Sequence, residues 1–153
     1  MARFRFKLEP VLRQRELAER DEQLRVAAIE RERLAMESEL RSQQQRIEAE
    51  ERALTAMTQG GRADASTIRW QGIALAAAKA EAQQQALKLA GVLRRLEQAR
   101  GVLAGKAAER RAIELLKERK RAEFKRDEDA AETRMLDDLA SAAAAKRALE
   151  IDE

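Results

Sequence analysis

The sequence lacks several residues on which enzyme and metal chemistry most often depend. Its 153 residues include no cysteine, no histidine and no tyrosine. The absence of cysteine excludes a disulfide framework and a thiolate metal site, and it fits a reducing compartment. Carboxylates are plentiful, but they form no evident metal-binding cluster. The single glycine pair, Gly60-Gly61, is not followed by the Lys-Ser or Lys-Thr of a phosphate-binding loop. We therefore predict a protein that is not an enzyme and has no cofactor, no metal and no small-molecule substrate.

Long hydrophobic runs are also missing. The charged start is not followed by the apolar stretch of a secretory signal peptide. No segment approaches the roughly 18 consecutive apolar residues of a membrane-spanning helix. These absences predict a cytosolic location.

The residues that are abundant favour long helices. Charged residues make up 39% of the chain and aromatic residues only 3%, so the bulky side chains of a thick core are scarce. Alanine, glutamate, lysine, leucine, arginine and glutamine dominate, which is typical of coiled coils. Disorder is the competing interpretation, but the net charge is only +3 and strong helix formers fill most positions.

Two series of apolar residues recur at heptad spacing, which predicts a coiled-coil seam on each of two helices. The first series is Val26, Ile29, Met36, Leu40, Ile47, Leu54 and Met57, with polar steps at Arg33, Gln43 and Glu50. Upstream, we expect Leu8, Leu12, Leu17 and Leu24 to continue it in a slightly shifted register. The second series is Leu75, Ala82, Leu89, Val92, Leu96, Ala99, Leu103, Ile113 and Phe124, with polar steps at Arg110 and Lys117.

The glycine pair separates the two series and is the only strong helix breaker. We therefore predict an all-α fold in which two long helices form an antiparallel coiled-coil hairpin. It is one coiled-coil domain, 1–153, with a first arm at about 7–58, a turn at about 59–66 and a second arm at about 67–125. Counting outward from the turn places residue 7 beside residues near 120. The C-terminal extension, about 126–153, then overhangs without a partner, and we expect it to be helical but frayed, or ordered on binding.

The aromatic residues gather at two places. Phe4 and Phe6 either close the open end of the hairpin against Phe124 or insert into a partner protein. Trp70, just after the turn, either packs on Met57 or marks a binding site.

A basic run between residues 106 and 126 holds nine lysines and arginines with four glutamates. It is either a solvated face of the coiled coil, a docking surface for an acidic protein, or a nucleic-acid-binding helix. Nucleic acid is the least favoured partner, because glutamates are interspersed and base-reading side chains are missing.

Three segments, in their order and spacing, resemble the flagellar FliJ family over the whole chain. The start, FRFKLEPVLRQRE, is similar to the family's aromatic and basic opening, which leads into a leucine-rich helix. The pair Arg69-Trp70 follows the turn as in some members, and KERKRAEFKRDEDAAETRMLDDLA resembles the close of the second arm.

The resemblance implies a component of the flagellar type III export apparatus, cytoplasmic and peripheral to the inner membrane at the flagellar base. Family members are antiparallel coiled coils similar to the central stalk of rotary ATPases. Their chain ends enter the export ATPase ring, their side contacts the membrane-embedded export gate, and they escort export chaperones. Carried over to this sequence, the ring-facing residues are Phe4, Phe6, Leu8, Leu12, Arg119, Arg121 and Phe124. The gate-facing residues are Trp70, Ile73 and Leu87. A generic coiled-coil scaffold or adaptor and a basic-helix nucleic-acid binder remain the alternatives.

Overall fold

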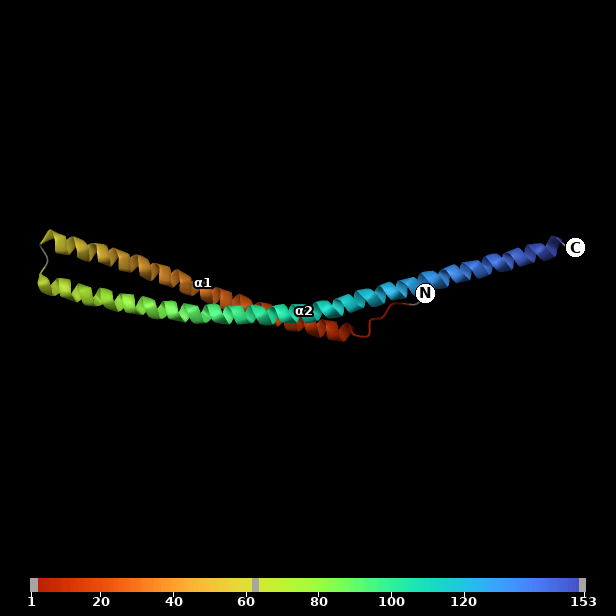
Figure 1. Ribbon diagram of the computed structural model, residues 1–153, viewed down its shortest axis with the longest axis horizontal. Coiled ribbons are helices and arrows are strands. Elements are labelled where there is room, and N and C mark those ends of the chain that lie inside the picture. Colours follow the sequence, from red (N-terminus) through yellow and green to blue (C-terminus); the bar gives the residue numbers. More distant parts are fainter. Residues whose placement is uncertain (1–2, 62–63, 152–153) are drawn as a thin grey trace. The chain divides into compact units, whose positions relative to one another are not determined.

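A computed structural model describes residues 3–61 and 64–151, with side chains up to residue 144. These residues form two helices and no strand (Figure 1). Helix α1 runs from Glu9 to Gly60 over 52 residues, and helix α2 runs from Ala65 to Ile151 over 87 residues. The predicted all-α hairpin is confirmed, although the connection is shorter than the predicted turn at 59–66.

The start of α1 follows from its proline. Pro10 is the second residue of the helix, where a missing N–H leaves no helical hydrogen bond unmade. The preceding segment closes onto the helix through two backbone bonds. The Glu9 N–H donates to the Phe6 carbonyl at 3.2 Å, and the Leu12 N–H donates to the Leu8 carbonyl at 2.9 Å.

The turn is built from a glycine and an aspartate. Gly61 directly follows α1 and has a φ of +61°, the left-handed conformation that commonly ends a helix and favours glycine. Asp64 directly precedes α2, where it accepts a hydrogen bond from the Ser66 hydroxyl through its carboxylate. Its carbonyl also accepts from the Ile68 N–H at 3.2 Å. Asp64 therefore caps the start of α2.

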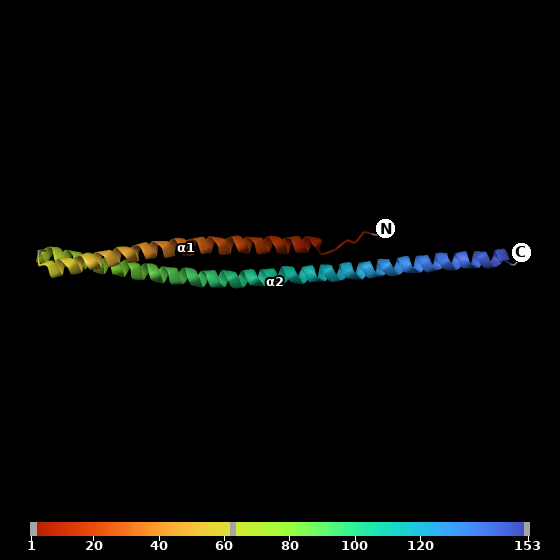
Figure 2. The same ribbon diagram turned by 90° about the horizontal axis from the view of Figure 1, so that it is seen from above.

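The structure divides into two compact units, which we describe separately. The turn unit comprises residues 19–106. In it α1 and α2 lie side by side in opposite directions (Figures 1 and 2). The buried side chains come from α2: Leu75, Val92, Leu96 and Ala99. The predicted apolar seam residues of α1, from Val26 to Met57, are all half-buried. Both predicted seams are confirmed in this unit.

Polar residues interrupt the seam of the turn unit. Arg33 and Gln43 are half-buried as predicted, and Gln43 Oε1 has no hydrogen-bond partner among the described residues. The predicted seam position Glu50 is wrong, because Glu50 is exposed and Glu51 is half-buried instead. Glu51 pairs across the helices with Lys79 at 2.5 Å, which explains its inward position. Arg95 with Glu32, at 2.6 Å, fixes the same antiparallel register further from the turn.

The second unit, which we call the end unit, comprises residues 1–18 and 107–153, apart from the undescribed ends. Leu12 is buried here, 4% exposed, and two ion pairs flank it across the helices. Arg15 pairs with Glu109 at 2.5 Å, and Glu9 pairs with Lys117 at 2.7 Å. The start of α1 therefore lies beside residues near 120, which confirms the register counted from the turn.

The predicted shifted register for the upstream leucines is wrong. Leu17 and Leu24 are 61% and 59% exposed. The heptad that starts at Leu12 continues without a shift, so polar residues such as Arg15 and Glu22 occupy the half-buried positions. Leu17 and Leu24 fall on the side of α1 that faces away from α2.

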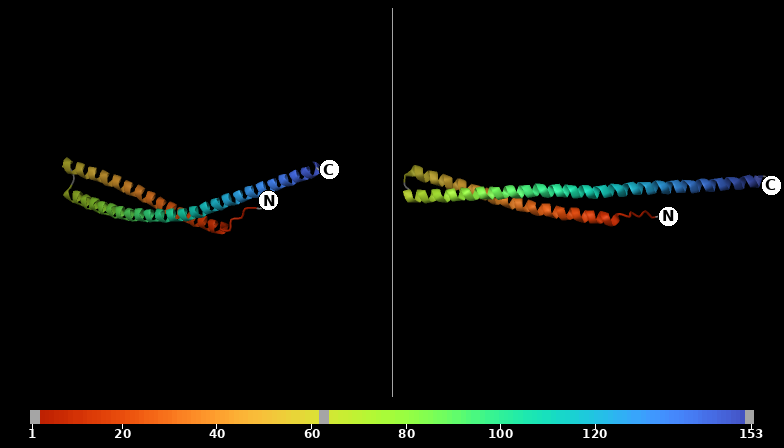
Figure 3. Two further views of the ribbon diagram at one scale, coloured as in Figure 1. Left: turned by 45° about the vertical axis from the view of Figure 1, so that its right-hand side comes forward. Right: turned by 60° about the horizontal axis from the view of Figure 1, so that its bottom comes forward.

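In the end unit, α2 continues beyond the residues that α1 covers (Figure 3). Every side chain from residue 125 to residue 144 is exposed. The predicted helicity of the C-terminal extension is confirmed, since α2 is unbroken to Ile151. Its predicted fraying or ordering on binding stays a prediction.

Candidate protein-binding surfaces

The first candidate surface lies where the segment before α1 meets α2 in the end unit. The ring centroids of Phe4 and Phe124 are 5.7 Å apart, with their planes inclined by 54°. The Lys117 Nζ lies 6.0 Å from the centroid of the Phe6 ring and donates to the Glu9 carboxylate. We call Phe4, Phe6, Lys117 and Phe124 the aromatic clasp. Aromatic pairs of this kind contribute about 1 kcal/mol, and cation–π contacts at exposed sites contribute similar amounts. The prediction that Phe4 closes against Phe124 is confirmed, whereas the ring contact shown for Phe6 is with Lys117.

The predicted ring-facing residues divide into two kinds. Phe4, Phe6 and Phe124 are half-buried in the clasp and Leu12 is buried on the inner side of α1, so these four shape the end unit. Leu8, Arg119 and Arg121 are exposed. Neither arginine makes an ion pair with a described residue, so both guanidinium groups are available to a partner.

Several cations of the basic run pair with glutamates of the same run. Arg110 pairs with Glu114 at 2.6 Å, and Lys120 pairs with Glu123 at 2.7 Å. Arg111 reaches both Glu114 and Glu118. Such a face suits a solvated helix better than a nucleic-acid-binding helix, which keeps its cations free for phosphates.

These contacts shift the acid–base properties of the run. Hydrogen bonds from Arg110 and Arg111 lower the pKa of Glu114. The hydrogen bond from Lys120, followed by its charge, lowers the pKa of Glu123. Hydrogen bonds that Arg33 donates to the carboxylates of Glu30 and Glu37 raise the pKa of Arg33 within the turn unit. All these groups therefore stay charged at neutral pH.

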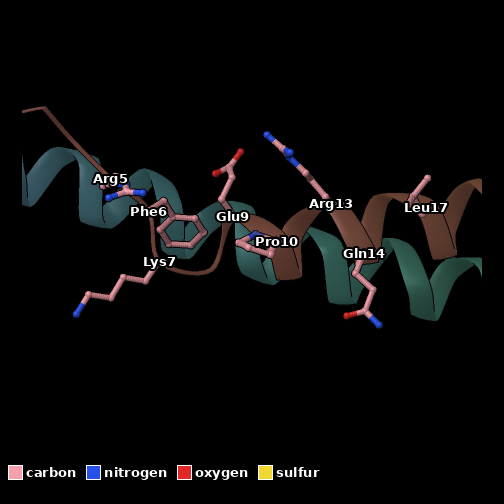
Figure 4. A pocket seen from close by; sticks show the side chains of 8 residues that line it. All are labelled: Arg5, Phe6, Lys7, Glu9, Pro10, Arg13, Gln14 and Leu17. Carbon is pink, nitrogen blue, oxygen red and sulfur yellow. The ribbon is translucent and has the colours of Figure 1, made fainter.

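A second candidate surface is an open groove of about 900 Å³ along the outer side of the start of α1. Its lining residues, drawn in Figure 4, are Arg5, Phe6, Lys7, Glu9, Pro10, Arg13, Gln14 and Leu17. Lys7 and Arg13 extend away from the ribbon, and Phe6 lies beside Pro10 (Figure 4). Arg5, Lys7 and Arg13 make no ion pair with any described residue. We call this site the basic groove.

The basic groove was not predicted from the sequence, because Leu17 was assigned to the seam. A strict heptad count from Leu12 would have placed Leu17 on the outer face, next to Arg13 and Gln14. The sequence therefore predicts an apolar and basic outer face at the start of α1, but only if the heptad register is counted from Leu12.

The third candidate surface lies in the turn unit on α2. Trp70, Ile73 and Leu87 are 71%, 55% and 74% exposed. Their spacing, with Ala77 and Ala80 between them, places them along one outer face of the helix. The prediction that Trp70 packs on Met57 is wrong, because most of the indole surface is exposed. Ile68 and Leu75 take the inward positions at the start of α2.

The described part of the chain contains neither a candidate metal site nor a candidate membrane-spanning helix. Within residues 3–61 and 64–151, no group of carboxylates is arranged to hold a metal ion. Neither helix, over the same residues, contains a stretch that is long and apolar enough to cross a membrane.

Comparison with known proteins identifies the family. Comparisons with curated proteins and with solved structures each gave no significant match. The family model described as flagellar FliJ protein matches residues 4–149, which is nearly the whole chain. The match includes the aromatic clasp, the basic groove and the outer face of α2. The chain belongs to the flagellar FliJ family, and it is thus a component of the flagellar protein export apparatus.

Proposed function

We propose that the chain is a non-enzymatic stalk that binds inside the ring of the flagellar export ATPase and couples it to the export gate. The observation that carries the proposal is the aromatic clasp. It holds Phe4 and Phe6 against α2 and leaves Leu8, Arg119 and Arg121 exposed around it. The family resemblance also implies that the end of the hairpin with the aromatic clasp is the part that enters the ring.

In this proposal, the clasp residues and Leu12 maintain the structure of the end unit. The exposed residues Leu8, Arg119 and Arg121 contact the ATPase ring. Phe4, Phe6 and Phe124 keep the segment before α1 ordered on α2. The free guanidinium groups of Arg119 and Arg121 bind carboxylates of the ring subunits. Arginine suits this role because its planar fork can bind a carboxylate through two hydrogen bonds.

Stimulation of the cognate ATPase tests the role of the two arginines. We expect Arg119→Glu/Arg121→Glu to remove most of the stimulation while the circular-dichroism spectrum stays unchanged. The matched control is Arg20→Glu/Arg31→Glu, which reverses two exposed charges of α1 that have no ion-pair partner among the described residues. Equal stimulation by both variants would contradict the assignment of the arginines.

The clasp is tested separately with Phe4→Ala/Phe6→Ala. We expect this variant to keep its helicity, because both residues precede α1, and to bind the ATPase ring more weakly. The measurement is a pull-down with the ATPase. Binding equal to that of the unaltered chain would remove the clasp from the proposed interface.

We further propose that Trp70, Ile73 and Leu87 contact the export gate. Exposed aromatic and aliphatic side chains in a row are costly in water, and interaction sites commonly use them. Trp70→Ala/Ile73→Ala is expected to weaken binding to the cytoplasmic part of the gate protein. Leu34→Ala, at an exposed leucine of α1, is the control. A loss of binding in both variants, or in neither, would contradict the assignment.

The proposed location is cytoplasmic and peripheral to the inner membrane, where the ATPase ring and the gate meet. Export chaperones are further proposed partners, and they follow from the family resemblance alone. The paired glutamates of the basic run favour these protein partners over a nucleic acid.

A further inference from the structure

The C-terminal extension of α2 carries an apolar stripe that continues the inner face of the helix. Beyond Phe124, the positions that follow at steps of three or four residues are Glu128, Ala131, Met135, Leu139 and Ala142. Phe124 is half-buried against Phe4, whereas Met135 and Leu139 are more than half exposed. The helix therefore presents a surface suited to another element over residues that α1 does not reach.

The extension is also strongly acidic. Residues 127–144 contain six carboxylates and one arginine. Glu128 and Glu132 lie on the same face as the apolar stripe, about two turns and one turn before Met135. Neither makes an ion pair with a described residue. An occupant of this face must therefore combine apolar side chains with cations.

The basic groove of the end unit has this combination. Phe6, Pro10 and Leu17 supply apolar surface, and Arg5, Lys7 and Arg13 supply cations without a described ion-pair partner. The groove runs about 10 Å from Pro10 to Leu17, at 1.5 Å per helical residue. The segment from Glu128 to Leu139 is about 16 Å long on the same basis, which suffices to cover the groove and the segment before it.

The extension cannot fill the groove of its own chain. Helix α2 is unbroken through this region to Ile151, and a helix without a break does not turn back on itself. We propose that the extension of one copy binds the basic groove of a second copy, and that the reciprocal contact forms at the same time. Two identical contacts related by a two-fold axis give a closed dimer.

The proposed contact has two independent sources of affinity. Met135 and Leu139 pack against Leu17 and Pro10, and Glu128 and Glu132 pair with Arg5 and Arg13. Because the charges stay near the surface, the dimer is expected to weaken as salt rises. This self-association stands apart from the proposed stalk function, since it is measured on the purified chain without the ATPase.

Sedimentation equilibrium of the full chain over a wide concentration range tests the proposal. We expect reversible dimerisation that weakens at high salt. Arg5→Glu/Arg13→Glu and Glu128→Lys/Glu132→Lys should each weaken it by about tenfold or more, since like charges then face each other in both contacts. Arg20→Glu/Arg31→Glu, with the same change in net charge as the groove variant, should dimerise like the unaltered chain.

Mixing the two charge-reversed variants is the decisive measurement. Each variant alone should be mainly monomeric, and the mixture should form a heterodimer, because the reversed charges complement each other in one of the two contacts. A chain that stays monomeric at every concentration would overturn the proposal. A dimer that neither variant weakens, or a mixture that restores no association, would do the same.

Disulfide trapping identifies the occupant directly, since the chain has no cysteine of its own. A mixture of Leu17→Cys and Leu139→Cys chains should form a cross-linked pair under mild oxidation, and Arg31→Cys in place of Leu17→Cys should not. A chain carrying both Leu17→Cys and Leu139→Cys should link to other copies. A bond within single chains instead would assign the groove to the chain's own extension and overturn the proposal.

Discussion

At the scale of single residues, the turn depends on the backbone of Gly61. Gly61 adopts the left-handed conformation, while its neighbour Gly60 is the last residue of α1. An added Cβ would meet nothing within 4 Å at either position, so only backbone conformation separates them. We expect Gly61→Ala to lower the free energy of unfolding by about 1 kcal/mol or more. Gly60→Ala is expected to be neutral or to stabilise by up to about 1 kcal/mol.

Thermal unfolding of the two variants, followed by circular dichroism, measures this difference. The two substitutions have identical chemistry at adjacent positions, so each serves as the control for the other. Equal melting temperatures would show that the left-handed conformation at Gly61 is not needed for the turn.

Glu114 gives a residue-scale prediction on pH. Its pKa is lowered below the ordinary value of 4.5 by hydrogen bonds from Arg110 and Arg111. A carboxylate with a lowered pKa in the folded state stabilises that state above its unfolded pKa, and the contribution disappears as the pH falls through the folded pKa. We therefore expect Glu114→Gln to melt at a lower temperature than the unaltered chain at neutral pH. The difference should shrink as the pH falls below 4.5.

The control for this prediction is Glu16→Gln. Glu16 is exposed and makes no ion pair with a described residue, so its substitution should change the melting temperature little at any pH. A Glu114→Gln difference that stays constant down to acid pH would contradict the ion-pair explanation.

At the scale of elements, the inward side of α2 holds the turn unit together. Leu96 is 3% exposed between the helices, whereas Leu93, three residues earlier, is 45% exposed. We expect Leu96→Asp to destabilise the fold by about 3–5 kcal/mol, because it removes buried apolar surface and buries an unpaired charge. Leu93→Asp should cost about 1 kcal/mol or less. Urea unfolding followed by circular dichroism compares them, and equal midpoints would contradict the seam.

Heptad periodicity predicted these elements because a two-helix seam is a local property of sequence. The half-buried apolar residues from Val26 to Met57 lie on a heptad repeat, and one glycine pair marks the reversal. The prediction failed where the seam itself is polar. Arg15 and Glu22 occupy inward positions that the apolar pattern assigned to Leu17 and Leu24, and Glu51 replaces Glu50. Long polar side chains tolerate a half-buried place because their charged ends reach solvent or an ion pair.

The candidate sites were predictable to different degrees for the same reason. Phe4 and Phe124 could be matched by counting residues outward from the turn, since the register of a hairpin is fixed by its turn. The basic groove depends on which side of α1 faces outward, and this required the correct register near Leu12. The sequence could not predict whether Trp70 is buried or exposed. A single aromatic residue next to a turn belongs to no repeating pattern that would place it on one side of the helix.

At the scale of the whole molecule, the two helices differ in length, and the excess of α2 has no support from α1. All side chains from residue 125 to residue 144 are exposed, although the backbone is helical throughout. An isolated helix of this length is marginal in water, so its amides open at little cost in free energy. Amides of the turn unit near Val92 and Leu96, in contrast, exchange only when packed side chains separate.

Hydrogen exchange measured by mass spectrometry therefore distinguishes these parts in the intact chain. At low protein concentration, peptides from 127–144 should exchange at least about tenfold faster than peptides around Leu96. At high concentration, the same peptides should gain protection, because the extension then lies in the basic groove of a second copy. The variant Arg5→Glu/Arg13→Glu should abolish this gain and leave the turn unit unchanged. Protection of residues 127–144 that is already strong at low concentration would mean that contacts within one chain support the extension, and it would contradict the exposed helix on which this prediction depends.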